Sequence, residues 1–430
     1  MVNIKERIRS VLIYFQRFTK TDNIYLAKNG IWAYAYYATA IGLGIVVSVV
    51  FARFSNPATY GYYQYIMAIT ATVAFLSMPG INTAILRSVT TGKEQSLIVG
   101  LKVRLKYSLL SVLALGGLAA YYFFIGKNEI LARLVLLGAV FFPTTYAFNC
   151  LFTLFNGRKQ FFKFYAWEFI MNLVSTASVV FAVLVLKDIL WILAFNFASY
   201  AVFYLVLYYF IVKRENLNSE QDEEIIPYGK KLTYIGLIPQ ILGNFDQLVI
   251  PHFLGVDSLA IYAISVKIPS ALKNLMVSIN PIIFPRLVDL KISAVLKKMA
   301  NFWMIFSFLI LLLITIASLP FAIHLLFGPN YLQAVRLAQI ASLSIFPVFL
   351  TKVVTDWSLA NKQSKFYLNI TAISDLGNAV FVIGALLIFH TLVSMVIAKV
   401  VVNVLALLVA LILALKSRSS TGPLEEKTIS

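Results

Sequence analysis

Long apolar runs alternate along the whole chain with short clusters of charged and turn-forming residues. The runs 29–52, 54–86 and 299–335, for example, contain no Asp, Glu, Lys or Arg. A helix that crosses a bilayer needs about 20 predominantly apolar residues, so each of these runs is long enough to span a membrane. Twelve spans are predicted in this way: 30–51, 60–86, 105–125, 130–155, 162–186, 189–212, 232–254, 258–285, 302–325, 332–357, 366–388 and 391–415.

The overall composition agrees with a membrane protein. The 430 residues are 60% hydrophobic and 13% charged, whereas soluble domains have roughly 45–50% apolar and about 25% charged residues. The chain is therefore predicted to be an all-α polytopic membrane protein. It has a single cysteine, Cys150, so no disulfide can form within the chain.

The basic residues predict an orientation. If the N-terminus is cytoplasmic, segments on that side hold 27 of the 36 Lys and Arg residues, and those on the opposite side hold five. Such an excess of basic residues marks the cytoplasmic face, so both termini are predicted to be cytoplasmic. The predicted localisation is the cytoplasmic (inner) membrane. The net charge of +18 is then a topology signal and an attraction to anionic membrane lipids, and it gives no support to a nucleic-acid partner.

Two halves with internal similarity are predicted. The triplet KFY occurs at Lys163–Tyr165 and Lys365–Tyr367, and the stretch Arg133–Pro143 resembles Arg336–Pro347. Six spans separate equivalent points, and an even number preserves orientation, so the repeats are parallel, as in some transporters. The predicted parts are a basic N-terminal segment (1–28), a six-helix bundle (29–213), a cytoplasmic linker (214–230), a second six-helix bundle (231–416) and a disordered tail (417–430).

Charged side chains inside predicted spans are the first candidates for a site, because they are costly in a bilayer. In the eighth span, Lys267, Ser270, Asn274 and Ser278 recur at helical spacing and share one stripe. The stripe is either the cationic wall of a cavity or a packed helix interface.

Two further pairs of charges lie in the last three spans. Lys352 and Asp356 are four residues apart and can form an intrahelical ion pair. Asp375 and Lys399 lie near the middle of neighbouring spans and can also pair. Glu168, in the fifth span, lines a cavity or lies at the membrane interface.

Asp246 lies in the stretch GNFDQLVIP, inside the seventh span. Pro239, Gly243 and Pro251 predict breaks or bends in this span. Asp246 either pairs with a lysine such as Lys267 or takes up a proton or cation during transport, and in both cases it should face the protein interior.

No cofactor, metal site or catalytic group is predicted. The three histidines fall at predicted outer ends of spans, and none has a partner at the spacing of a metal site or a catalytic pair.

Several stretches resemble the Wzx-type oligosaccharide flippases of the multidrug/oligosaccharidyl-lipid/polysaccharide (MOP) superfamily. The resemblance covers nearly the whole chain. It is carried by Leu26–Tyr65, Gly80–Arg87, Phe245–Pro269, Phe284–Leu287 and Leu326–Pro347.

This resemblance implies two six-helix bundles around a central cavity, which carry a polyprenyl (undecaprenyl)-diphosphate-linked oligosaccharide to the outer leaflet by alternating access. Asp246 in the FDQL motif, Lys267 and Arg286 are the positions that carry over from the family. A polysaccharide polymerase and chain-length proteins are the implied partners. Coupling to H⁺ or Na⁺ stays open.

Other functions compete with this interpretation. A MATE-like, cation-coupled drug or metabolite exporter should have acids in its first bundle, but the first four predicted spans contain no Asp or Glu. An enzyme of lipid-linked sugar metabolism would need catalytic groups at one face, which the short outer loops do not offer. A structural assembly partner is the third alternative.

Overall fold

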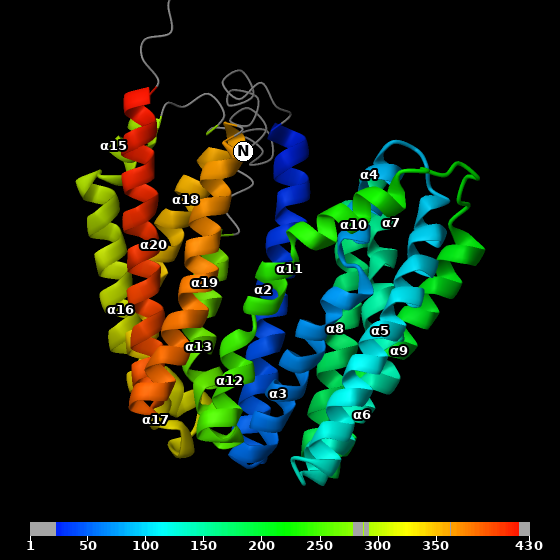
Figure 1. The fold of residues 1–430 in the computed structure, drawn as a ribbon, viewed down its shortest axis with the longest axis horizontal. Coiled ribbons are helices and arrows are strands. Elements are labelled where there is room, and N and C mark those ends of the chain that lie inside the picture. The colour runs from blue at the N-terminus through cyan, green and yellow to red at the C-terminus, as the bar shows by residue number, and fades with distance from the viewer. Residues whose placement is uncertain (1–22, 278–286, 288–291, 362, 421–430) are drawn as a thin grey trace, which may run out of the picture. The chain divides into compact units, whose positions relative to one another are not determined.

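The computed structural model describes residues 23–277, 287, 292–361 and 363–420 (Figure 1). The elements of this part are all helices. They form two compact units, one of residues Tyr25–Ile261 and one of the described residues from Tyr262 onward. Two of the candidate residues lie outside the described residues. They are Ser278, from the polar stripe of the eighth span, and Arg286, which carries over from the family resemblance.

The N-terminal unit contains straight helices and several broken ones. Its α-helices are α2 (Asn23–Phe54), α3 (Pro57–Val73), α4 (Gly80–Thr90), α5 (Ser96–Phe124), α6 (Glu129–Phe142), α7 (Phe152–Gly157), α8 (Phe161–Phe181), α9 (Ile189–Arg214), α10 (Ile225–Ile235), α11 (Leu237–Leu242) and α12 (Phe245–Leu254). Short 3₁₀ and π turns join some of them, namely η1 (Ala74–Ser77), η2 (Pro143–Ala147), η3 (Phe148–Leu151) and η4 (Ala182–Leu186).

The boundary between the two units lies within α13 (Val256–Val277), so that this helix begins in the N-terminal unit and continues in the C-terminal unit. Its other elements are α15 (Ile292–Met299), α16 (Phe302–Phe327), η5 (Pro329–Tyr331), α17 (Gln333–Ser342), α18 (Ile345–Ala360), α19 (Ser364–Phe389) and α20 (Leu392–Ser420). In this unit α19 and α20 pack side by side.

Short polar residues define where several helices begin. A side-chain oxygen before the first turn accepts a hydrogen bond from a free backbone N–H and so stabilises the helix start. Four helices start in this way, and in each the distance joins the side-chain oxygen to the backbone nitrogen that donates to it. The pairs are Asn56 and Thr59 at α3 (2.7 Å), Asn128 and Leu131 at α6 (3.0 Å), Asp188 and Leu190 at α9 (2.8 Å), and Asn301 and Trp303 at α16 (3.0 Å).

Nine helices in the described part of the chain are long and apolar enough to cross a membrane, or ten if the bent pair Pro57–Ser77 and Gly80–Thr90 is one span. Ten of the twelve predicted spans are recovered in this way. The seventh, 232–254, is divided into α10, α11 and α12, with breaks at Gly236 and at Gly243–Asn244. The eighth corresponds to α13, which carries Asp257, Lys267 and Lys273 and is not among the apolar helices.

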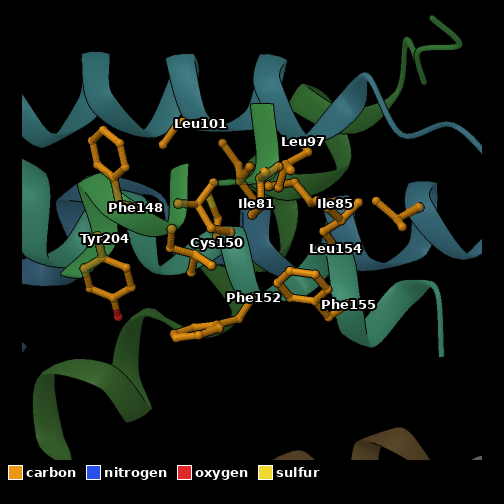
Figure 2. Packing of buried hydrophobic residues seen from close by; sticks show 14 of the residues in the cluster. Ile81, Ile85, Leu97, Leu101, Phe148, Cys150, Phe152, Leu154, Phe155 and Tyr204 are labelled. Atoms are coloured by element: carbon orange, nitrogen blue, oxygen red, sulfur yellow. The ribbon is translucent and has the colours of Figure 1, made fainter. Parts of the chain in front are cut away.

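A buried apolar cluster holds the broken part of the N-terminal unit together (Figure 2). Ile81 and Ile85 of α4 meet Leu97 and Leu101 of α5, and side chains of η3, α7 and α9 complete the cluster. Cys150 lies within it and is 0% exposed.

The predicted internal repeat has a local structural counterpart. Gln160 precedes α8 with φ −86° and ψ 60°, and Gln363 precedes α19 with φ −89° and ψ 62°. The backbone N–H of Gln160 donates to the Phe155 carbonyl and that of Gln363 to the Ser358 carbonyl, at 2.8 Å in both cases. The same turn therefore occurs at corresponding points of the two similar sequences.

The segment after α9 packs back onto the N-terminal unit. α10 lies against α4, and α12 lies against α3. The Gly80 N–H at the start of α4 donates to the Thr233 hydroxyl at 3.0 Å, and the two helices approach closely at Gly80 and Gly229. The compact unit thus continues to Ile261, whereas the sequence places the second bundle from residue 231. That functional division stays a prediction.

Candidate functional site

The polar stripe of α13 contains the first candidate, Lys267. Lys267 and Ser270 are half-buried, and Asn274 is exposed. Among the described residues of its own unit, no carboxylate forms an ion pair with Lys267. Since Lys267 and Asp246 belong to different units, their predicted pairing stays a prediction.

Asp246 occupies the first turn of α12, just after the break at Gly243 and Asn244. It is half-buried, and its Oδ1 accepts a hydrogen bond from the Gln247 N–H at 3.0 Å. Free backbone N–H groups and the helix dipole stabilise an acid at a helix N-terminus. The break therefore gives the carboxylate local partners that an unbroken membrane helix would lack.

The intrahelical pair predicted in α18 is present. The Lys352 ammonium lies 2.7 Å from the Asp356 carboxylate. Asp356 is only 5% exposed, while Lys352 is partly exposed. A buried carboxylate thus holds a lysine that still reaches the surface of its unit, so the lysine remains available to an anionic ligand.

Lys399 has a different partner from the one predicted. Its ammonium donates to the Tyr262 hydroxyl at 2.9 Å and lies 5.6 Å from the centre of that ring. Asp375 forms no ion pair among the described residues, so the predicted pairing of Asp375 with Lys399 is wrong. Tyr262 is buried at the start of its unit and offers the lysine both a hydroxyl and a π face, which the spacing of charges alone does not reveal.

Glu168 lies in α8 with polar and aromatic neighbours. The Tyr36 hydroxyl of α2 donates to its carboxylate. Asn172, one turn further along α8, donates through Nδ2 to the Tyr36 oxygen at 3.3 Å and to the Glu168 backbone carbonyl at 2.9 Å. No ion pair of Glu168 occurs among the described residues, and the donor to this carboxylate is the neutral Tyr36 hydroxyl.

Arg104 is a buried cation that the sequence does not single out. It lies on α5, is 1% exposed, and has no carboxylate partner among the described residues. Its guanidinium donates to the Asn82 side chain (2.6 Å), to the Asn149 side chain, and to the backbone carbonyls of Tyr146 (2.7 Å) and Ser77 (3.3 Å). Ser77 and Tyr146 lie in the breaks η1 and η2, so Arg104 holds two irregular segments together.

A network of ion pairs ties the predicted cytoplasmic linker to the loops of the N-terminal unit. Arg158 binds Glu94 through two nitrogens, at 2.6 and 2.7 Å, and Glu215 at 2.6 Å. Lys163 binds the other oxygen of Glu215 at 2.7 Å. The hydrogen bonds of Arg158 keep the pKa of the Glu94 carboxyl below its usual value.

Asp222 adds a second attachment for the linker. Its carboxylate accepts from the Ser88 hydroxyl at 2.9 Å and lies 3.4 Å from the Lys93 ammonium, and the hydrogen bond from Ser88 lowers its pKa. Residues 215–224, part of the predicted linker 214–230, are therefore anchored to α4 and to the loop that follows it.

Removal of Arg158 should destabilise this network in a pH-dependent way. Because Arg158→Ala leaves Glu94 and Glu215 without their shared donor, we expect a loss of about 2 kcal/mol at pH 7. Glu94 has a lowered folded-state pKa, so its contribution is complete above its ordinary pKa of 4.5 and is lost as the pH falls through the folded value. The difference in melting temperature between wild type and variant should shrink below that pH.

The matched control is Arg133→Ala. Arg133 pairs with Glu129 at 2.9 Å, but both side chains are largely exposed, so its loss should change stability by no more than about 0.5 kcal/mol. Equal melting temperatures of the Arg158 and Arg133 variants across pH 4–8 would contradict a stabilising role for the network.

Three lysines stand out in the C-terminal unit as groups able to bind an anion: Lys267, Lys352 and Lys399. In the N-terminal unit, Glu168 with its tyrosines and Asp246 at the helix break offer hydrogen-bond acceptors. The described residues hold no group of three or more His, Cys, Asp or Glu that could bind a metal ion.

Residues 26–291 match the sequence profile of the polysaccharide biosynthesis protein family. The match covers more than half of the chain. The chain belongs to this family. The matched range of this chain includes α12 with Asp246 and α13 with Lys267.

Individual relatives extend the comparison. Over 126 residues the chain is 27% identical to a Shigella flexneri protein described as an O-antigen transporter, in a match that spans 29% of this chain and 28% of that relative. The fold is similar to the inward closed conformation of the lipid II flippase MurJ, with a TM-score of 0.65 at 14% identity, over 91% of this chain and 88% of that one.

A second solved structure has the same architecture. An inward-facing multidrug resistance MATE family transporter of the MOP superfamily superposes with a TM-score of 0.64 at 14% identity, over 89% of this chain and 94% of that one. At this identity the likeness concerns the fold alone. The protein is thus an all-helical, multi-pass membrane protein whose fold is similar to the folds of these two solved structures, and the names of its relatives describe transporters rather than enzymes.

Proposed function

We propose that this family member is a flippase, which moves a polyprenyl (undecaprenyl)-diphosphate-linked oligosaccharide from the cytoplasmic to the outer leaflet by alternating access. The observation that carries the proposal is the family match over residues 26–291 together with a fold shared with a lipid II flippase. The product would serve cell-surface polysaccharide assembly.

The charged groups fit such a substrate. A diphosphate needs cations in a region of low dielectric constant, where their attraction is strong, and Lys267, Lys352 and Lys399 are cations in or beside apolar helices. The oligosaccharide needs hydrogen-bonding and aromatic side chains, and the polyprenyl chain can stay in the bilayer.

The finer architecture belongs to the same proposal. Twelve spans form two parallel-repeat bundles with both termini in the cytoplasm, and the protein lies in the cytoplasmic (inner) membrane. Asp246, Asp375 and Arg286 are further positions proposed to face the substrate path. A polymerase and chain-length proteins take the product onward, and a gradient of H⁺ or Na⁺ is a candidate driving force.

The test is a leaflet-exchange assay with purified protein in liposomes. The probe is a fluorescent undecaprenyl-diphosphate oligosaccharide prepared from the source organism's own membranes, and a membrane-impermeant quencher reports its leaflet. The proposal expects faster exchange than in protein-free liposomes. Folded protein that leaves the exchange rate at the protein-free level would contradict it.

Lys267→Ala is expected to slow this exchange at least tenfold, because removal of a partly desolvated cation costs more than about 1.4 kcal/mol of anion binding. Lys297→Ala is the matched control, since Lys297 is an exposed lysine on α15 of the same unit. Equal rates for the two folded variants would remove Lys267 from the site.

A MATE-like exporter is the second candidate, favoured by the fold likeness to a multidrug transporter. It predicts that the same liposomes move small organic cations in exchange for H⁺ or Na⁺. Cation movement without lipid exchange would favour the exporter.

A further inference from the structure

One face of α8 and one face of α2 meet around Glu168. Tyr165, Glu168 and Asn172 are three and seven residues apart and so share a face of α8, as Trp32 and Tyr36 share a face of α2. Glu168 is half-buried in an apolar helix. Lys163, the basic residue nearest in sequence, binds Glu215 instead.

Aromatic rings connect the two faces. The centres of the Tyr36 and Tyr165 rings are 5.5 Å apart at an angle of 35°, and those of Tyr36 and Tyr37 are 5.4 Å apart at 60°. Trp32 packs edge-on against Phe162 at 4.9 Å. These rings are not fully enclosed by the described part of their unit, where Trp32 is 41% and Tyr37 48% exposed.

The polar atoms of the cluster are only partly used. The carboxylate of Glu168 has two oxygens and about four acceptor positions, and within the described residues it receives the Tyr36 hydroxyl. The Asn172 Nδ2 has two partners, while its Oδ1 accepts no hydrogen bond among the described residues. Acceptors therefore remain beside exposed rings.

This combination suits a sugar. Hydroxyl groups of a pyranose donate to carboxylate and amide oxygens, and the C–H groups on the ring face carry a small positive charge that is attracted to the negative face of an aromatic ring. A diphosphate, in contrast, would be repelled by Glu168, so the anionic end of a glycolipid belongs elsewhere.

We propose that Glu168, Tyr36, Tyr37, Tyr165, Asn172 and Trp32 form a subsite that binds the glycan part of the transported lipid. This inference rests on the proposed flippase function. It adds a set of residues that bind the sugar, separate from the lysines that bind the diphosphate. Glu168 and Asn172 bind hydroxyl groups, and the exposed rings cover the apolar sugar face.

The experiment compares two lipids in the exchange assay described above. One is the oligosaccharide-bearing undecaprenyl diphosphate from the source organism, whose exchange is measured. The other is sugar-free undecaprenyl diphosphate, which is added as a competitor and whose inhibition of this exchange is measured. The variants are Glu168→Gln and Trp32→Ala, with Tyr37→Ala as a replacement if either fails to fold. Trp191→Ala, an exposed tryptophan on α9, is the matched control.

We expect each site variant to raise the half-saturating concentration of the oligosaccharide lipid about tenfold, the effect of one lost hydrogen bond or ring contact of about 1.4 kcal/mol. Inhibition by the sugar-free lipid should be unchanged, and Trp191→Ala should behave as wild type. An equal loss for both lipids would overturn the subsite. So would unchanged affinities with a lost response to a pH or Na⁺ gradient, which would make Glu168 a cation-coupling group.

A binding measurement separates this inference from the proposed function. The glycan is released from the lipid and added to purified wild type and Glu168→Gln, which keeps every tryptophan, while tryptophan fluorescence is recorded. Glycan binding that is lost in Glu168→Gln, without lipid exchange by wild type, would refute the flippase and retain the subsite. Lipid exchange by wild type with no difference in the variants would refute the subsite alone.

Discussion

Arg104→Leu should lower the free energy of unfolding by at least about 3 kcal/mol, because it leaves buried carbonyl oxygens without donors at about 1–3 kcal/mol each. The side chain donates to the Ser77 and Tyr146 carbonyls and to Asn82, and each of these acceptors loses its donor in the variant. Leucine fills much of the volume but donates nothing. Since the orphaned groups belong to two helix breaks, the breaks should loosen together.

The measurement is the apparent melting temperature of detergent-purified protein. Lys102→Leu is the matched control, because Lys102 lies two residues away on α5 and is exposed. Lys102→Leu removes one positive charge, as Arg104→Leu does, but it leaves no buried acceptor without a hydrogen-bond donor. If both leucine variants have the same apparent melting temperature as wild type, Arg104 does not stabilise the breaks.

Gly80→Val is expected to destabilise the protein by about 3 kcal/mol, at the upper end for an overpacked contact. A Cβ at Gly80 would lie 2.4 Å from the Thr233 backbone nitrogen and 2.5 Å from the Gly229 carbonyl oxygen. Both are backbone atoms of α10, so no side chain can move aside and the two helices must separate. The hydrogen bond from the Gly80 N–H to Thr233 would then lengthen.

Gly117→Val tests whether this effect comes from the contact or from the loss of a glycine. Gly117 lies within α5, and a Cβ there would meet nothing within 4 Å; valine is the better helix former by a few tenths of a kcal/mol. We expect Gly117→Val to melt at or above the wild-type temperature. Protease cleavage between α9 and α10 should become faster in Gly80→Val alone.

The sequence predicts local breaks and pairs well, because their causes are local. Pro239 and Gly243 predicted a broken seventh span, and the structure divides it into α10, α11 and α12. The four-residue spacing of Lys352 and Asp356 predicted their ion pair. In both cases the relevant atoms lie within two helical turns.

Contacts between distant segments escaped prediction. The charge pattern places Arg104 among the 27 basic residues of the cytoplasmic side, since an arginine near the end of an apolar run normally marks a loop. Its acceptors come from positions 22 to 45 residues away and only meet when the helices break. Lys399 was paired with Asp375 on charge, but the fold brings it to Tyr262.

The anchoring of the linker was missed for the same reason. A stretch rich in acids and polar residues is typical of a solvated connection, and nothing in its own sequence shows that Glu215 and Asp222 meet Arg158 and Ser88. Arg158 is one basic residue among several beside the fourth span. Only the packed N-terminal unit distinguishes it.

The enclosed thiol of Cys150 makes the natural protein a ready background for spectroscopic labelling. Its sulfur lies among core side chains (Figure 2) and is not exposed, and the chain has no other cysteine. Maleimide dyes or spin labels should therefore react only with cysteines introduced on purpose, without a prior cysteine-free mutant. One label on each compact unit would then follow their relative movement during a transport cycle, with every native residue of the core still in place.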